Sequence, residues 1–165
     1  MDPQSTTSDA TSSARTVSEL PPAAIAFAGR MYDSARTGQL DVFEQALPLG
    51  LPANMTNEKG DTLLMLAAYH GHADLVELLI QHGADPNRVN DRGQSPLAGA
   101  VFKKEDIVIE ARHVLLEGLA DPDLGSPSAM QCVTMFNQES VWKDKFEKAP
   151  GKGKGKDKAE KLTPS

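Results

Sequence analysis

Two histidines separated by one residue, His70 and His72, are the first side chains in this sequence whose types and spacing suggest chemistry. Imidazole nitrogens are common zinc ligands, and a protein zinc site needs three or four such ligands. No cysteine or third ligand stands near the pair with the spacing of a metal site. We therefore predict no metal site in this chain.

The only thiol that could act as a nucleophile is Cys132. It lies on a predicted apolar helix face without obvious His or Asp partners to activate it, which favours a buried, inert thiol. A single cysteine also excludes an internal disulfide framework and fits a reducing compartment. Because no acid/base pair faces a substrate cleft, we predict no catalytic residue, no cofactor and no enzymatic activity.

The Gly-Lys-Gly-Lys-Gly-Lys stretch at residues 151–156 does not form a phosphate loop. That loop needs Gly-x-x-x-x-Gly-Lys-Ser/Thr between a strand and a helix, and Asp157 stands where the hydroxyl should be. Two interpretations of the basic tail remain. It is either a solubilising segment or the site of a weak, salt-sensitive contact with RNA or an acidic protein.

The net charge of −6 is unevenly distributed. Residues 143–165 hold eight Lys and four acidic residues, a balance of +4, so residues 1–142 carry −10. An acidic body argues against nucleic-acid binding outside the tail. There is no run of about 18 apolar residues, so no transmembrane helix is predicted. The Ser/Thr-rich N-terminus has no apolar segment, which argues against a secretory signal.

The sequence repeats itself with a period of 33 residues around the stretch 57–89. Residues 57–60 (Asn-Glu-Lys-Gly) return as residues 90–93 (Asn-Asp-Arg-Gly). The same shift places Gly50 on Gly83, so a degenerate first unit precedes the central one in register. Self-similarity at a fixed period of this length is the signature of a repeat architecture.

Each unit is predicted to be a pair of short helices. Thr62 and Ser95 stand where N-caps are expected, and Pro96 follows the second of them at the first helical position. The second helix of the third unit is predicted to run three residues longer than its central counterpart, close to one turn. Such a helix pair cannot bury its own apolar face, so the units must stack. The predicted helices are 23–36, 41–47, 63–70, 73–81, 97–102, 105–117, 129–136 and 138–148.

We predict one repeat domain, residues 21–149, between disordered tails at 1–20 and 150–165. Low apolar content is the reason for both tails, because such segments cannot bury enough surface to offset chain entropy. The predicted units are about 24–56, 57–89, 90–122 and 123–149, with the last acting as a C-terminal cap.

Gly-x-Thr/Ser-x-Leu, Gly-His, a Leu/Val-rich helix and Gly-Ala-Asp-x-Asn, at 33-residue spacing, resemble the ankyrin repeat. The resemblance covers about residues 26–137, and longer strings look like small stand-alone ankyrin proteins of fungi and bacteria. It implies an all-α solenoid of about four helix-turn-helix units, with loops projecting beside a concave face. It also gives His72 a structural role as the histidine of Gly-His. The family's Thr-Pro-Leu-His loses its histidine at residues 62–65 and 95–98, so we expect these units to depend more on apolar packing.

In ankyrin proteins, partners commonly contact the loop tips and the exposed positions of each first helix. Tyr69 and Phe102 occupy the same repeat position, and they either form a pair of interface anchors or pack between units. Carried over by position, the implied partner-binding residues are Arg36 in the first unit, Glu58, Lys59, Asp61, Tyr69 and His70 in the central unit, and Asp91, Arg92, Gln94, Phe102 and Lys103 in the third.

The resemblance implies a protein-protein interaction module, acting as an adaptor, scaffold or escort. The acidic body favours a partner with a basic segment. We expect a monomer in the cytoplasm, and also in the nucleus, without membrane contact. The alternative is a ribosome- or RNA-associated factor that uses the basic tail. A third possibility is an accessory subunit that stabilises an enzyme through the same concave face.

Overall fold

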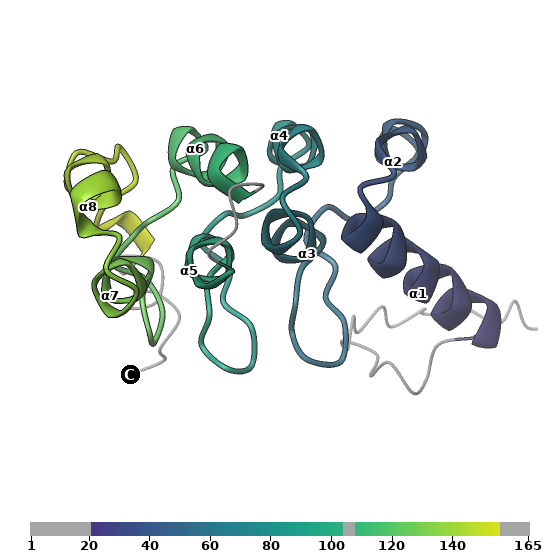
Figure 1. Ribbon diagram of the computed structural model, residues 1–165. Helices are drawn as coiled ribbons and strands as arrows, with labels where there is room; N and C mark the ends of the chain where they lie inside the picture. The colour runs from purple at the N-terminus through teal and green to yellow at the C-terminus, as the bar shows by residue number, and fades with distance from the viewer. Residues whose placement is uncertain (1–20, 104–107, 156–165) are drawn as a thin grey trace, which may run out of the picture.

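The computed structural model describes residues 21–103 and 108–155, and these ranges contain helices but no named strand. The helices stand in two layers, with α1, α3, α5 and α7 in one and α2, α4, α6 and α8 in the other (Figure 1). We call the layer of α1, α3, α5 and α7 the inner layer and the layer of α2, α4, α6 and α8 the outer layer. Successive helices of the inner layer contact one another, and so do the two helices of the pairs α3–α4, α5–α6 and α7–α8. The predicted all-α solenoid is confirmed. Its helices are α1 Pro22–Thr37, α2 Leu40–Ala46, α3 Leu63–Tyr69, α4 Ala73–Gln81, α5 Pro96–Phe102, α6 Ile109–Glu117, α7 Ala129–Met135 and α8 Glu139–Glu147.

Hydroxyl caps start the first helix of three units, and the caps at Thr62 and Ser95 confirm the sequence prediction. Thr62 Oγ1 accepts a hydrogen bond from the backbone N–H of Met65 at 3.1 Å, and Ser95 Oγ accepts one from Ala98 at 3.1 Å. Ser128 starts α7 through a reciprocal capping box. Each cap satisfies a helix N–H that has no partner inside the helix.

The second helix of the third unit corrects the sequence prediction. Both α4 and α6 have nine residues, and Val108 lies outside the α-helix that starts at Ile109. Six residues, 103–108, separate α5 from α6, whereas three, 70–72, separate α3 from α4, so the three extra residues of this unit fall between its two helices. The predicted start at residue 105 lies outside the described residues. An insertion in a connection leaves the packed face of the helix in register.

The first helix of the stack, α1, is longer than its counterparts. It has 16 residues, whereas α3, α5 and α7 have seven each. The repeat period aligns the start of α3 with Arg30, so residues 22–29 add two turns that the other units lack. These turns project beyond the rest of the stack (Figure 1).

The core is one continuous cluster that runs through all four units. Small residues let the helices of the inner layer approach one another, because Ala67, Ala68 and Ala100 are fully buried. The largest fully buried side chains are Phe43, Phe146, Leu63, Leu64, Leu75, Leu79, Leu97, Leu115, Val76, Val101, Val108 and Val133.

Asparagine side chains tie together the closing turns of the first three units. The Asn54 amide donates to the carbonyl oxygen of Gly83 at 3.0 Å, and its Oδ1 accepts from the N–H of Asp85 at 2.7 Å. Asn87, 33 residues later, makes the same pair of hydrogen bonds to the closing turn of the third unit. The repeat therefore reproduces polar contacts as well as apolar packing.

The fourth unit extends beyond its predicted end at residue 149. Asp121 is buried, and its two carboxylate oxygens accept the backbone N–H groups of Gly153 and Gly155, each at 2.9 Å. Residues 150–155 therefore close the fourth unit, which corrects the prediction of a disordered tail from 150 onward. The rest of that tail, 156–165, and the N-terminal tail, 1–20, lie outside the described residues.

The Gly-Lys alternation has a structural meaning in this segment. Gly151 and Gly155 are buried against the closing turn of the third unit, and Lys152 and Lys154 are exposed. A Cβ on Gly151 would collide with the backbone carbonyl of Leu119. Glycine is therefore required where the chain passes closest to the stack.

Candidate functional site

Three loops, which we call fingers, project from the layer of α1, α3, α5 and α7 on the side away from α2, α4, α6 and α8 (Figure 1): residues 55–62, 88–95 and 124–128. Asn57 shapes the first finger, because its Oδ1 accepts from the N–H groups of Lys59 at 2.9 Å and Asp61 at 3.0 Å. Asn90 repeats this pattern in the second finger. The third finger is three residues shorter, because five positions separate Asp123 from the cap Ser128 where eight separate Asn87 from Ser95.

The structure places most of the predicted partner-binding residues on or near the surface. The exposed ones are Glu58, Lys59, Asp91, Arg92 and Phe102, and the half-buried ones are Arg36, Tyr69, His70, Gln94 and Lys103. Asp61 is the exception and is buried.

Asp61 is a structural residue rather than a surface group. Only 9% of it is exposed, and its Oδ1 accepts from the Asn90 side chain at 2.8 Å. A second hydrogen bond of 3.5 Å joins Oδ2 to the Asn57 amide. The neighbouring finger therefore covers the carboxylate, which removes it from the surface available to a partner.

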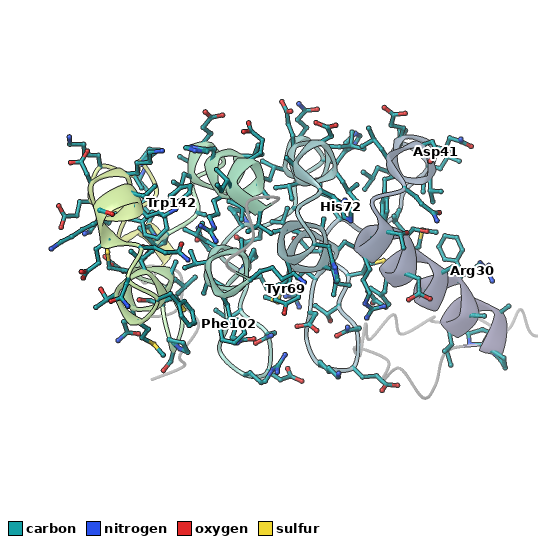
Figure 2. The ribbon with its side chains drawn as sticks, viewed as in Figure 1. Arg30, Asp41, Tyr69, His72, Phe102 and Trp142 are labelled. Carbon is teal, nitrogen blue, oxygen red and sulfur yellow. The ribbon has the colours of Figure 1, made fainter. Side chains whose placement is uncertain are left out.

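Tyr69 and Phe102 both pack across a seam between units (Figure 2). The Tyr69 ring lies beside Gly99 of the next unit, where an added Cβ would be 3.9 Å from Cδ2. The Phe102 ring meets Phe136 of the fourth unit edge-on, with centroids 5.5 Å apart. Inter-unit packing is therefore part of the role of both rings. Phe102 nevertheless remains 51% exposed, so much of its surface is open to a partner.

The fourth unit continues this row of side chains. Met135 stands 33 residues after Phe102, just as Phe102 stands 33 after Tyr69, and it is 63% exposed. We call Tyr69, Phe102 and Met135 the inner row. Met135 is absent from the predicted partner-binding residues, because that prediction relied on the aromatic side chains at this position. The repeat spacing alone would have identified Met135.

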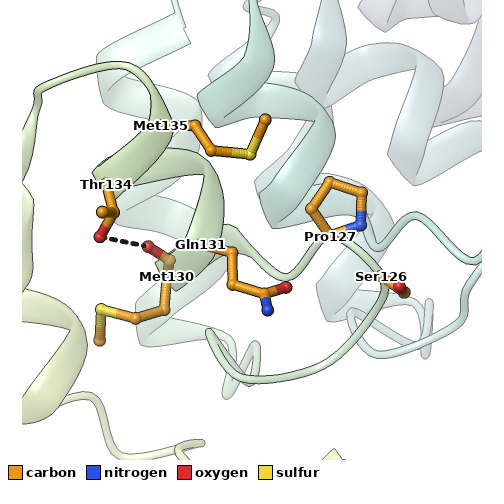
Figure 3. A pocket seen from close by; sticks show the side chains of 6 residues that line it. All are labelled: Ser126, Pro127, Met130, Gln131, Thr134 and Met135. Carbon is orange, nitrogen blue, oxygen red and sulfur yellow. Dashed lines mark hydrogen bonds between the residues drawn. The ribbon is translucent and has the colours of Figure 1, made fainter.

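A shallow hollow of about 620 Å³ lies beside the short third finger (Figure 3). All of its lining side chains are uncharged, and they are Ser126, Pro127, Met130, Gln131, Thr134 and Met135. Two of them are methionines, whose flexible thioether chains adapt to ligands of varied shape. The surface formed by the third finger and α7 is therefore largely apolar and adaptable.

A second hollow, of about 450 Å³, lies between α1 and the first finger and brings together the predicted Arg36, Glu58 and Lys59. Ile25 and Tyr32 contribute apolar surface to it. Burial raises the pKa of the Tyr32 hydroxyl, so this group stays protonated at neutral pH. The Arg36 guanidinium is paired with Asp33 at 2.7 Å.

The outer helices α2, α4 and α6 carry exposed acidic charge. They hold no exposed Lys or Arg, because the only such residue among them, Arg112, is buried. This locates part of the negative charge of the body on its outer face. The exposed acidic residues are Asp41, Glu44, Asp74, Glu77, Glu110 and Glu117.

The sequence pattern of the family described as ankyrin repeats (3 copies) matches residues 31–124. The chain belongs to the ankyrin-repeat family. The matched range contains the α1–α2, α3–α4 and α5–α6 pairs, apart from the N-terminal turns of α1.

Relatives of this ankyrin chain support the same assignment. A putative ankyrin repeat protein of Pseudomonas aeruginosa is 56% identical over 52 residues, which cover 32% of this chain and 30% of that protein. Human ankyrin repeat domain-containing protein 63 is 38% identical over 64 residues, covering 39% of this chain and 17% of that protein. Mouse ARF GTPase-activating protein GIT2 is 33% identical over 96 residues, covering 55% of this chain and 14% of that protein. The match therefore spans less than a third of each relative's length.

The ankyrin Gly-His histidine is structural, as the resemblance implied. His72 Nε2 donates to the carbonyl oxygen of Arg36 in the preceding unit at 2.8 Å, and its ring packs against Gly38. The rings of His70 and His72 are stacked 6.4 Å apart. Among residues 21–103 and 108–155, no three His, Cys, Asp or Glu side chains gather as a metal site would require.

Two further findings concern the predicted chemistry of the chain. Cys132 is buried, and burial raises the pKa of its thiol, so little of the nucleophilic thiolate forms. In the part of the chain that the structure describes, no helix combines the length and hydrophobicity needed to cross a membrane.

Proposed function

We propose that this ankyrin-repeat chain is a non-catalytic adaptor that binds a protein partner through its concave side. The inner row carries the proposal. Tyr69, Phe102 and Met135 repeat at one position over three units, and Phe102 and Met135 each leave more than half of their surface exposed. Ankyrin repeats are in general protein-protein interaction modules. Large exposed apolar side chains in a line supply the kind of anchors that dominate protein interfaces.

The partner segment would place an apolar side chain in the methionine-lined hollow beside the third finger. Further along the partner segment, its side chains would meet the charged tips of the first two fingers, since Glu58, Lys59, Asp91 and Arg92 are all exposed. A basic segment in the same partner would be attracted by the acidic outer helices, mainly through a faster association rate. Such attraction weakens as salt screens the charges.

The test is affinity capture with purified wild-type chain and a Phe102→Ser/Met135→Glu variant. We expect the variant to lose the proteins that the wild type captures, because a buried carboxylate opposes an apolar contact. Val141→Glu is the matched control, because Val141 is an exposed apolar residue of α8 outside the inner row. Equal capture by all three folded chains would overturn the proposal.

A second candidate function rests on the exposed lysines of residues 150–155, which we call the closing segment. Lys152 and Lys154 are exposed, and Lys152 Nζ also lies 3.8 Å from Asp123 Oδ2. Helix α8 adds exposed Lys143 and Lys145, with exposed Lys148 directly after it. If the chain acts through RNA, a Lys152→Glu/Lys154→Glu variant should lose co-purifying RNA and keep its protein partners. Wild-type binding to RNA should then weaken steeply with salt, because phosphate contacts release counterions. Retention of all captured RNA by the variant would reject this candidate.

A further inference from the structure

The two ends of the solenoid have different surfaces. At the C-terminal end, six of the eight exposed residues of α8 and the position after it are charged, namely Glu139, Lys143, Asp144, Lys145, Glu147 and Lys148, and Val141 is the one exposed large apolar residue among them. At the N-terminal end, α1 and α2 enclose a hollow of about 520 Å³ with no charged residue in its lining. We call this surface the N-terminal end face, and its apolar members are Phe27, Met31, Val42, Ala46, Leu49 and Leu51.

The N-terminal end face exposes large apolar groups. Leu49 is 88% exposed and Phe27 is 42% exposed. The added turns of α1 lie within residues 21–29 (Pro-Pro-Ala-Ala-Ile-Ala-Phe-Ala-Gly), which contain no polar side chain. The terminal repeats of a solenoid normally present a polar outer face, because no further unit covers them. This end is instead built like an internal seam.

The sequence before α1 is poorly suited to cover this face. Among residues 1–20 the only large apolar side chains are Met1, Val17 and Leu20, and the rest are mostly Ser, Thr, Ala and acidic residues. A stable cover for an apolar face needs apolar area of its own. Residues 1–20 are therefore a poorer match for this face than a second apolar surface.

We propose that the N-terminal end face binds the same face of a second copy, giving a two-fold symmetric dimer. A two-fold interface must be self-complementary, because one patch meets itself. Phe27 and Leu49 line the hollow together with Val42 and Leu51 and keep 42% and 88% of their own surface exposed, so this face offers both apolar side chains that can enter a partner's hollow and a hollow that can receive them. No charged residue lines the hollow, but the Arg30 guanidinium lies over the Phe27 ring, 5.8 Å from its centre, so the dimer must keep the two copies of Arg30 apart. Head-to-tail stacking is disfavoured because the opposite end is charged. The proposed dimer differs from the monomer expected from the sequence.

The test is the mass of the full chain in solution, measured by sedimentation velocity over a wide range of concentrations. We expect a concentration-dependent dimer for the wild type. A Phe27→Glu/Leu49→Glu variant should raise the dimer dissociation constant by at least about a hundredfold, because each substitution acts twice at a two-fold interface. Val141→Glu, at the charged end, is the matched control and should leave the dissociation constant unchanged.

Folding of each variant is checked by the fluorescence of Trp142, which is buried at the opposite end of the stack. A wild type that stays monomeric at every concentration overturns the proposal. So does a folded Phe27→Glu/Leu49→Glu variant that dimerises as the wild type does. Open-ended growth of the wild type into filaments would show head-to-tail stacking and would equally reject the two-fold dimer.

Discussion

The guanidinium of Arg112 lies 5.1 Å from the centre of the Trp142 ring, at the seam between the third and fourth units. Its Nε and Nη2 donate to the carbonyl oxygen of Ala100 at 3.1 and 2.9 Å, and Nη1 donates to Gln138 Oε1 at 3.0 Å. Arg112 is only 2% exposed. Burial lowers the pKa of this guanidinium, yet an arginine remains charged at neutral pH. One buried cation thus joins α5, α6 and α8.

Replacing Arg112 with Ala should destabilise the chain by about 3 kcal/mol, because buried carbonyl groups lose their donors and a cavity opens. Arg112→Lys should recover only part of this loss, since an ammonium cannot reproduce the planar fork. Urea unfolding followed by circular dichroism measures both changes. Arg92→Ala is the control, because Arg92 is exposed, and its effect should stay within about 0.5 kcal/mol. Equal stability of all four proteins would show that Arg112 does not hold the seam.

The contact between His72 and Arg36 gives a second prediction. His72→Ala removes the hydrogen bond to the Arg36 carbonyl and the packing against Gly38, so unfolding should become easier by about 1–2 kcal/mol. His82→Ala should have little effect, because that side chain is exposed. Thermal denaturation of the three proteins measures the difference. If the two variants lose stability equally, the Gly-His contact does not link the first and central units.

Gly151 offers a test of the closing segment. Gly151→Ala should lower the free energy of unfolding by about 1–3 kcal/mol, because the new Cβ must push the segment away from the backbone of Leu119. Gly29→Ala is a matched glycine control, since a Cβ there meets nothing within 4 Å. That change should stabilise α1 by up to about 1 kcal/mol. Thermal denaturation should therefore shift in opposite directions. A neutral Gly151→Ala would mean that the segment does not pack on the stack.

The thiol of Cys132 gives a pH prediction. Its raised pKa means that the folded chain holds the proton at pH values where an unfolded chain has lost it. Above the ordinary thiol pKa, the unfolded state therefore binds fewer protons and the free energy of unfolding should fall. Alkylation of the native thiol should also be much slower than alkylation in urea. Equal alkylation rates in the two states would contradict the burial of this side chain.

The inner row shows how far sequence reasoning extends. The 33-residue period alone places Tyr69 and Phe102 at one repeat position, and both rings lie at seams between units. Met135 follows from the same period but belongs to another residue class. Its exposure of 63% does not follow from the period, because exposure depends on which side chains of other units lie against it.

Asp61 and Gly151 mark what sequence reasoning could not predict. Both lie in polar, glycine-containing stretches that are typical of exposed loops. Asp61 is covered because the next finger brings Asn90 within 2.8 Å of its carboxylate. Gly151 is covered because Leu119 lies at the end of another unit. In each case the decisive neighbour is about 30 residues away along the chain.

The sequence by itself determined the repeat period, the helix pairs, the hydroxyl caps at Thr62 and Ser95, and the family. These features depend on interactions within a few residues or on the periodicity of the chain. Only the tertiary structure decided that the third unit's insertion lies in a connection, that residues 150–155 close the fourth unit, and that the N-terminal end face exposes Phe27 and Leu49. The physical reason is that burial is a property of two surfaces, and the second surface belongs to another unit.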